Sequence, residues 1–373
     1  MYDHGGGIGC IINEFVQPVE HISHPRITPA EAENMTTEKQ VPDWKKATIP
    51  YQTPDVRRSI WNIVNTLVPF GVLFYLMYLS LDISYWLTLA LAIPAAGFLV
   101  RIFILFHDCC HGSLFKSPRA NRIVGYITGI LTFTPYERWK HDHSIHHATA
   151  GDLDRRGVGD VMTLTVDEYL ALSPLKRLGY RLFRHPLVMF TVGPFFIFII
   201  SHRFALRNAG KRERMSVVIT NLAVLAMVTG LILLMGWKAY LLVHLPIILL
   251  GTGAGVWMFY VQHNFVGSYW TRHKDWDFSK AGLKGSSFYK LPRLLQWFTG
   301  NIGFHHIHHL NPRIPNYKLE ACYRASELLQ QVPPLSIRTS LKSLSLRLWD
   351  EPSKKMVGLA ALKQRPEETT PVA

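Results

Sequence analysis

The sequence is poor in cysteine and in acidic residues. Only four of its 373 residues are cysteine: Cys10, Cys109, Cys110 and Cys322. Adjacent Cys109 and Cys110 are poorly placed to bridge each other, so a small disulfide-bonded domain is excluded and reduced thiols are expected. The 26 acidic residues are outnumbered by 40 lysines and arginines, which gives a formal net charge of +14. Because no compact basic motif is interleaved with aromatic residues, we expect no nucleic-acid partner.

The first 54 residues lack the pattern of a signal peptide. Residues 1–54 contain no apolar run beside a charged start, so they do not form a signal peptide. No internal repeat with a fixed period is present. We therefore interpret residues 1–54 as a polar N-terminal segment, residues 55–332 as one domain, and residues 333–373 as a mixed-charge C-terminal tail.

Long apolar runs are abundant, and 48% of the residues are hydrophobic. Four runs, at about residues 60–81, 85–106, 217–235 and 240–261, are long enough for a helix that crosses a bilayer, which takes about 20 residues. The links at residues 82–84 and 236–238 carry at most one lysine or arginine, whereas the other connecting segments are basic. Since basic residues favour the cytoplasmic side, we predict an all-α, multi-pass membrane protein with both termini in the cytoplasm.

Two shorter apolar runs lie at about residues 123–134 and 186–201, each with basic residues on both sides. A further single crossing would invert the topology of everything downstream. We therefore predict interfacial or re-entrant helices for both runs.

Histidine is unusually frequent, with 18 copies, and eight of them form three clusters: His107 and His111; His143, His146 and His147; and His305, His308 and His309. Residues four apart share one face of a helix, so their imidazoles can bind one metal ion. A single pair would be a weak signal. Three clusters that the charge pattern puts on the cytoplasmic side are hard to explain by packing, and together they predict a histidine-rich metal cap.

The number of imidazoles limits the kind of metal site. Eight exceed the four ligands of a structural zinc ion and are enough for two ions. Imidazole binds iron, copper, zinc and nickel, so the ligand type alone does not identify the metal. The absence of a Glu-x-x-His motif argues against the carboxylate-bridged di-iron bundle.

Three motifs contain these clusters: HDCCHGSLF at residues 107–115, HHATAGDLDRRGVGD at 146–160, and GNIGFHHIHHLNPRIPNYKL at 300–319. With them the chain resembles the membrane fatty acid desaturases over about residues 44–319, in particular the omega-6 (delta-12) acyl desaturases. The resemblance implies two iron ions, molecular oxygen and an electron donor. It also implies a ninth histidine ligand, matched by His263, with Asn264 as a possible water-mediated contact. Cys110 departs from the family, which commonly has glycine there.

The function expected from this resemblance is insertion of a cis double bond into a fatty acyl chain carried by a lipid or a thioester. The chain has no HPGG signature of a fused cytochrome. The donor is therefore expected to be a separate ferredoxin, or a b-type cytochrome with its reductase. The double-bond position and the acyl carrier stay open.

Three other functions compete with this one. A hydroxylase on the same scaffold would act on an alkane, sterol or carotenoid. A zinc-dependent membrane hydrolase is disfavoured by the lack of HExxH and by the surplus of imidazoles. A proton-relaying transporter would place its histidines along the spans rather than at one face.

Several further residues are candidates for supporting roles. Carboxylates could orient ligating imidazoles at Asp108, Asp142, Asp152 and Asp154. Aromatic walls of an acyl tunnel are predicted at Trp139, Phe133, Tyr136, Trp257, Tyr260 and Phe304. A basic surface for the donor is predicted at Arg155, Arg156, Arg181, Arg184, Arg203, Arg207, Lys211, Arg212, Lys274, Lys290 and Arg293.

The remaining histidines are not expected to bind metal. Exposure is predicted for His4, His21, His24, His185, His202 and His273. His244 lies within a span, where we expect it to bond a backbone or side-chain partner. His141 and His306 fall outside the repeated spacing.

Overall fold

The computed structural model describes residues 42–364. Most of the predicted N-terminal segment, with Cys10, His4, His21 and His24, lies outside these residues. Within them the chain is mostly helical, and four long helices are apolar enough to cross a membrane: α4 (Val56–Ser80), α5 (Tyr85–His111), α11 (Lys211–Met235) and α12 (Trp237–His263). Each predicted apolar run falls on one of them. The helices extend beyond the runs, and α5 carries the first histidine pair on its last turn and a half.

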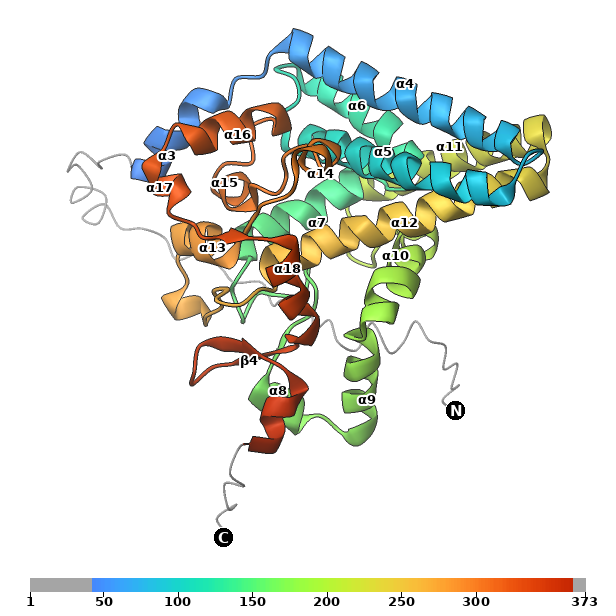
Figure 1. Cartoon of the computed structure of the whole chain (residues 1–373). Coiled ribbons are helices and arrows are strands. Elements are labelled where there is room, and N and C mark those ends of the chain that lie inside the picture. The colour runs from blue at the N-terminus through green and yellow to red at the C-terminus, as the bar shows by residue number, and fades with distance from the viewer. Residues whose placement is uncertain (1–41, 365–373) are drawn as a thin grey trace. The chain divides into compact units, whose positions relative to one another are not determined.

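The ends of these helices follow local capping rules. The side chain of Asp55 accepts a hydrogen bond from the backbone N–H of Arg58 at 3.1 Å and starts α4. Gly112 ends α5 in the left-handed conformation with φ 67°, which glycine adopts without steric cost. The short α4–α5 and α11–α12 links lie together at the end opposite the C-terminal helices (Figure 1).

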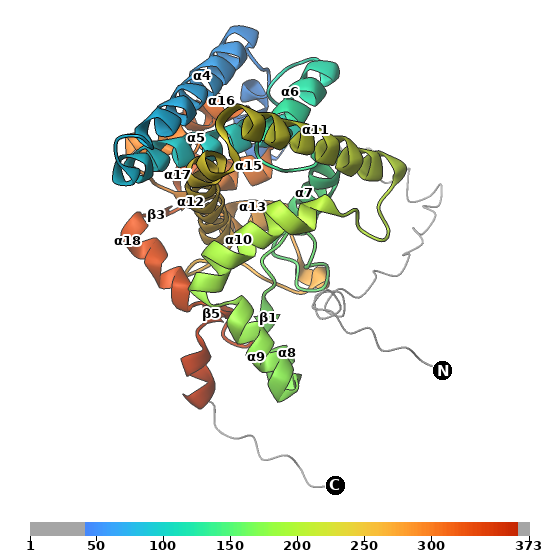
Figure 2. The same ribbon diagram turned by 90° about the vertical axis from the view of Figure 1, so that its right-hand side faces the viewer.

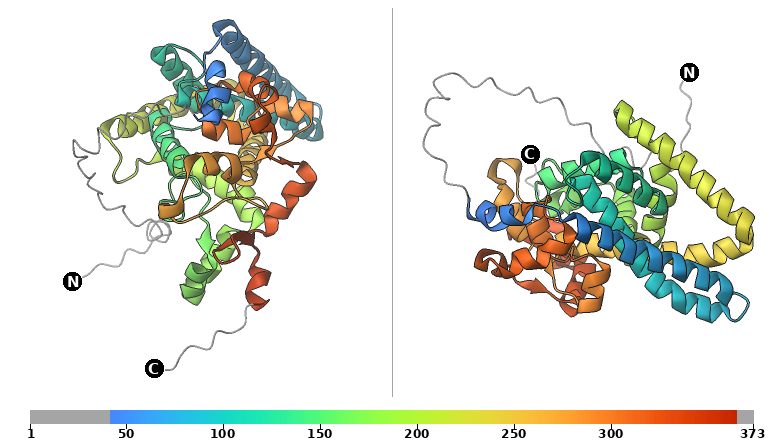
Figure 3. Two further views of the ribbon diagram at one scale, coloured as in Figure 1. Left: turned by 90° about the vertical axis from the view of Figure 1, so that its left-hand side faces the viewer. Right: turned by 90° about the horizontal axis from the view of Figure 1, so that it is seen from above.

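α5 is the central helix of the apolar part. It packs against α4, α6 (Pro118–Leu131) and α12, and its apolar residues are mostly buried. Ala92, Ala95 and Leu99 of α5 form a core cluster with Val243 and Ile247 of α12. The view from above in Figure 3 shows α4 beside α5, and α11 leading back into α12. The two helices that carry a histidine at their C-terminal ends, α5 and α12, are therefore packed together.

The two shorter apolar runs behave differently. The first falls on α6, which leads into α7 (Tyr136–Thr149), the helix of the second histidine cluster. The second falls on a segment of π-helix (Val188–Val192), α10 (Gly193–Phe195), π-helix (Phe196–Ile200) and 3-10 helix (Ser201–Arg203). This segment bends by 60° from α9 (Pro174–Phe183), as Figure 2 shows. The pair has the form of a broken span or a re-entrant loop, so residues 42–364 contain four candidate spans, or five if the pair is one span.

The other described elements of residues 42–364 are short. They are α3 (Asp43–Thr48), α8 (Val166–Ala171), α13 (Phe278–Gly285), α14 (Arg293–Phe298), α15 (His305–Leu310), α16 (Asn316–Arg324), α17 (Glu327–Gln330) and α18 (Ile337–Ser340). Short 3-10 helices cover Ile49–Tyr51, His273–Asp275, Leu341–Ser345 and Leu359–Gln364.

Five short strands join segments that are far apart in the sequence. β1 (Leu164–Thr165) pairs in parallel with β4 (Leu348–Asp350), which pairs antiparallel with β5 (Lys355–Val357). β2 (Phe288–Tyr289) pairs in parallel with β3 (Pro334–Leu335). Leu348 and Trp349 are buried. Residues 334–364, whose mixed charge suggests a tail, are therefore packed onto the domain.

Candidate metal centre

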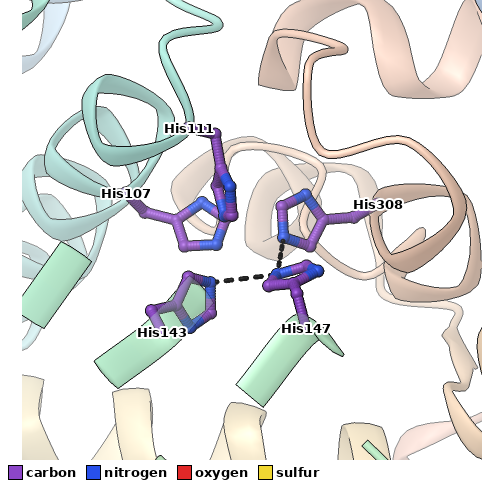
Figure 4. A group of neighbouring side chains, drawn as sticks. All are labelled: His107, His111, His143, His147 and His308. Atoms are coloured by element: carbon purple, nitrogen blue, oxygen red, sulfur yellow. Dashed lines mark hydrogen bonds between the residues drawn. The ribbon is translucent and has the colours of Figure 1, made fainter. Parts of the chain in front are cut away.

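Nine imidazoles meet at one end of the long helices. They form two groups, in each of which one nitrogen per ring lies within 4.8 Å of the others. The five-histidine group contains His107, His111, His143, His147 and His308, and the four-histidine group contains His146, His263, His305 and His309. Figure 4 shows the rings of the five-histidine group turned toward a common space. All nine histidines singled out in the sequence are members, and Cys110 belongs to neither group because it packs among apolar side chains.

The two histidine triplets divide between the groups in opposite ways. On α7, His143 and His147 join the five-histidine group while His146 joins the other. On α15, His305 and His309 belong to the four-histidine group, and His308 belongs to the five-histidine group. Neighbouring residues of a helix point about 100° apart, so adjacent histidines diverge while residues four apart converge. The spacing that suggests one face in the sequence therefore serves two sites.

Several nitrogen–nitrogen distances within each group are close to 3 Å. In the four-histidine group, Nε2 of His263 lies 3.1 Å from Nε2 of His146 and 3.0 Å from Nε2 of His305. In the five-histidine group, Nε2 of His147 lies 3.1 Å from Nε2 of His143 and 3.0 Å from Nε2 of His308. Imidazole nitrogens bind zinc at about 2.0–2.1 Å, so two of them at right angles on one ion of that size are roughly 3 Å apart.

Two outside partners fix the tautomers in the four-histidine group. Nδ1 of His146 lies 2.5 Å from Oδ1 of Asp160, and Nδ1 of His263 lies 3.2 Å from the carbonyl oxygen of Gly285. A carboxylate and a carbonyl can only accept, so both Nδ1 atoms donate, and in neutral rings both Nε2 atoms present lone pairs. These two lone pairs face each other at 3.1 Å. A shared cation satisfies that arrangement.

Burial favours the neutral form of five imidazoles on α7 and α15. Desolvation, reinforced by the neighbouring imidazoles, holds the pKa values of His143, His147, His305, His308 and His309 well below the usual histidine range. Neutral imidazole is the form that binds a metal ion. The nine imidazoles fit two metal ions, and these five can bind without prior loss of a proton.

Asp160 is the supporting carboxylate that the sequence analysis misses. It closes the second motif but lies 14 residues after His146, so helical spacing gives no signal for the contact. Among the predicted carboxylates, Asp108 comes nearest to a ligand group, with Oδ1 3.8 Å from Nδ1 of His107. Asp152 instead contacts His273 and Arg155. The other two pair with different residues: Asp142 with Arg138 and His141, and Asp154 with Arg272.

A buried hydrogen-bonded chain extends from Asp108 into the apolar part of α5. The backbone and side-chain nitrogens of Asn316 donate to Asp108 Oδ2 at 2.9 and 2.8 Å. Asn62 donates to the Asn316 side chain at 3.0 Å and accepts from the guanidinium of Arg101. Arg101 also donates to Thr66 at 3.0 Å. The chain ties α4, α5 and α16 together beside the first histidine pair.

A cavity of about 330 Å³ adjoins both groups. Its walls include His107 and His143 of one group and His305 of the other. Of the six aromatic residues predicted as tunnel walls, only Trp139 lines it. The hydroxyl of Tyr260, for example, is directed instead to the carbonyls of Ser343 and Leu346 at 2.8 Å.

Two of the remaining histidines depart from expectation. His202 is buried and lines the cavity instead of being exposed. His244 stacks on Tyr240, and neither of its ring nitrogens has a hydrogen-bond partner within residues 42–364. The side-chain oxygen of Asn264 lies 3.4 Å from Thr163 and from Arg184, and its water-mediated contact stays a prediction.

The other histidines agree with the sequence analysis. His306 faces the carbonyl of Leu329 at 3.2 Å and joins neither group. Three more are exposed, namely His141, His185 and His273.

The predicted basic surface is partly neutralised. Arg155 donates to Asp152 at 2.6 Å, and Arg156 pairs with Glu168. Arg184 is almost fully buried, where it donates to backbone carbonyls. These three arginines hold the domain together and do not offer free positive charge.

Comparisons with known proteins agree with this site. A family model described as fatty acid desaturase matches residues 84–338. A Bacillus subtilis (strain 168) protein named fatty acid desaturase is 50% identical over 326 residues, which cover 87% of this chain and 93% of the relative. A Synechocystis sn-1 oleoyl-lipid 12-desaturase is 26% identical over 324 residues, covering 80% and 84%. A Nostoc sn-1 acyl-lipid omega-3 desaturase (ferredoxin) is 25% identical over 322 residues, covering 82% and 84%. All nine histidines lie inside the family match.

Proposed function

The chain belongs to the fatty acid desaturase family of oxidoreductases, and on that premise we propose that it inserts a cis double bond into the acyl chain of a membrane lipid at a two-iron centre, with molecular oxygen as the oxidant. The names of the Synechocystis and Nostoc relatives support a lipid-linked substrate. The double-bond positions stated in those two names differ. From the three histidine motifs we propose the omega-6 (delta-12) type.

The observation that carries the proposal is the pair of facing lone pairs on His146 and His263, 3.1 Å apart. We assign one iron to the five-histidine group and one to the four-histidine group. Iron bound there would activate molecular oxygen, the oxidant that removal of hydrogen from an unactivated methylene requires and that no side chain can replace. Asp160 and the carbonyl of Gly285 hold two imidazoles with their Nε2 atoms directed inward.

The cavity supports an acyl chain as the substrate. Its wall is apolar at Leu99, Ile197 and Ile248 and ends at His107 and His305. An apolar wall binds methylene groups by removing them from water, at about 0.8 kcal/mol per group. The proposed role of the cavity is to hold one carbon–carbon bond beside the metals and to exclude water from it.

The proposed topology has α4, α5, α11 and α12 crossing the bilayer, with both termini and all nine histidines on the cytoplasmic side. The positive-inside pattern supports it, as does the position of the two short links opposite the C-terminal helices (Figure 1). Reporter fusions at Asp82 and Gly236 should read as external, and fusions after Gly151 and Gly210 as internal. An external reading at Gly210 would make residues 188–203 a true span and reject the topology.

The proposed electron donor is a separate acidic protein of the ferredoxin class. The printed name of the Nostoc relative includes ferredoxin, and the chain carries a formal charge of +14. Opposite charges speed the association of two proteins more than they strengthen the complex.

The test is expression in a host of known lipid composition, with mass spectrometry to locate new double bonds and metal analysis of the purified protein. We expect unsaturated lipid products and about two irons per chain. Hydroxylated products would favour the competing hydroxylase. Zinc as the metal that supports activity would reject the two-iron centre.

A further inference from the structure

Three glycines alternate along α12, and two of them are explained by packing. A Cβ atom on Gly251 would lie 2.8 Å from Cδ2 of Leu99 on α5. A Cβ atom on Gly253 would lie 2.5 Å from the carbonyl oxygen of Phe190. Both positions let α12 approach a neighbouring segment closely. The third, Gly255, is different, because no described neighbour would lie within 4 Å of its Cβ.

Gly255 borders the acyl cavity. The face of α12 that lines this cavity includes Ile248, Gly251, Gly255, Phe259 and Gln262, which recur at the three- and four-residue spacing of one helix face. With a rise of 1.5 Å per residue, this face is about 21 Å long and Gly255 lies about half-way along it. A side chain at position 255 would therefore divide the cavity into two parts.

The two parts differ in polarity. The part beyond Gly255, away from the metals, includes the apolar side chains of Leu99, Ile197 and Ile248. The cavity wall also includes the buried His202 and Thr132, whose hydroxyl donates to the carbonyl of Thr128 at 2.9 Å. Thr252 also lies there, but its hydroxyl donates to the carbonyl of Ile248 at 2.7 Å. The ester end of an acyl lipid needs hydrogen-bond partners when it leaves water, and the methyl end does not. The apolar part therefore suits the methyl end of the chain.

We propose that the missing side chain at position 255 sets how many carbons lie between the oxidised bond and the methyl end of the acyl chain. This inference rests on the proposed function, in which the cavity holds the substrate. A larger residue at position 255 fills the passage to the apolar part. The methyl end then stops closer to the metals, and the bond beside the metals lies nearer to that end.

The experiment replaces Gly255 with alanine, valine and leucine in the full chain. The variants are expressed in a host fed fatty acids of graded length. We expect the number of carbons between the new double bond and the methyl end to fall progressively from alanine to leucine. The longest substrates should be lost first, with metal content unchanged. Gly230→Val is the matched control, because Gly230 lies in apolar α11, has equal room for a Cβ and does not line the cavity.

Three results would overturn the inference. One is an unchanged product pattern in Gly255→Leu. Another is loss of activity in Gly255→Ala with the metal content intact. The third is the same shift in Gly230→Val, which would indicate a general effect on the membrane helices. A wild-type protein that makes no double bond would instead reject the proposed function itself.

Discussion

The two histidine groups are supported in different ways. In the four-histidine group every imidazole is buried, and Asp160 and Gly285 orient two of them from outside. In the five-histidine group His111 is half-buried, and Nδ1 of His107 and Nδ1 of His147 have no hydrogen-bond partner within residues 42–364; Nδ1 of His305 in the four-histidine group has none there either. Its rings contact each other and Trp139, whose ring stacks on that of His143 with 4.2 Å between the ring centroids.

This difference indicates that the imidazole rings of the two groups are held in place by different interactions. The protein itself fixes rings of the four-histidine group, because hydrogen bonds to outside partners set both ring orientation and tautomer. The five-histidine group relies more on a bound ion to align its rings. We therefore expect a tightly held metal in the first group and a more exchangeable metal in the second.

Removal of a ligand should have the largest effect and should be equal for the two groups. We expect His308→Ala and His305→Ala each to bring desaturation below detection and to lower the metal content from about two ions per chain to about one. His107→Ala and His146→Ala should behave in the same way. The readouts are metal analysis and lipid products. His244→Ala is the control, because it removes a buried histidine outside both groups, and full activity in His308→Ala would contradict the assignment.

Loss of the carboxylate behind His146 should come next and should affect the four-histidine group alone. Asp160→Ala removes the acceptor that fixes the His146 tautomer, and such changes typically cost about 10–100-fold in metal affinity or activity. Asp160→Asn keeps an acceptor oxygen and should recover part of the loss. Asp142→Asn is matched, because Asp142 also borders the cavity but contacts no ligating imidazole. Equal effects of Asp142→Asn and Asp160→Asn on metal affinity would refute the role of Asp160.

Metal removal should separate the groups by rate. A chelator is expected to take metal in two phases, the faster one from the five-histidine group, because His111 is half-buried and the ring nitrogens there lack outside partners. His305→Ala, which leaves the five-histidine group intact, should lose its remaining ion several-fold faster than His308→Ala. Stopped-flow measurement with a coloured chelator gives both rates of metal loss. Faster loss from His308→Ala than from His305→Ala would contradict the proposed difference between the two groups.

The smallest effect is expected at the surface near the five-histidine group. Lys140 is exposed and close enough to His111 to act on it electrostatically. Lys140→Glu should slow the reduction of the metal centre by an acidic electron donor a few-fold at low salt, and it should leave the metal content unchanged. At about 0.15 M ionic strength screening acts over about 8 Å, so the difference should fade as salt rises. Reduction that stays equally fast in the variant and the wild type at low salt would contradict donor approach from this side.

Eight of the nine imidazoles and the four apolar helices could be predicted because both signals are local, whereas His263 was implied only by the resemblance to the desaturase family. The three- and four-residue spacing of His143, His146 and His147 indicates a helix, and an apolar run of about 20 residues indicates a membrane span. Even so, spacing alone did not reveal that His146 and His147 belong to different groups. That division depends on where α5, α12 and α15 lie around α7.

The features that escaped prediction depend on distant contacts. The pairing of β1 with β4 joins residues 164–165 to residues 348–349 through strands too short to give an alternating pattern. Similarly, the contact of Asp160 with His146 depends on the path of a loop. The six tunnel-wall residues were predicted from aromatic character near helix ends, whereas the cavity wall also contains Gly251 and Gly255, for which a search for aromatic residues gives no signal.

The opposite division of the two histidine triplets makes the separation of the two sites a property of helix geometry. His146 and His147 are adjacent on one rigid helix, and so are His308 and His309 on another. Each adjacent pair is related by a fixed step of 1.5 Å and 100°. A sliding or tilting movement of α7 or α15 displaces ligands of both sites together. The spacing between the two histidine groups is therefore set within α7 and α15 themselves and not by the lengths of the loops that join these helices.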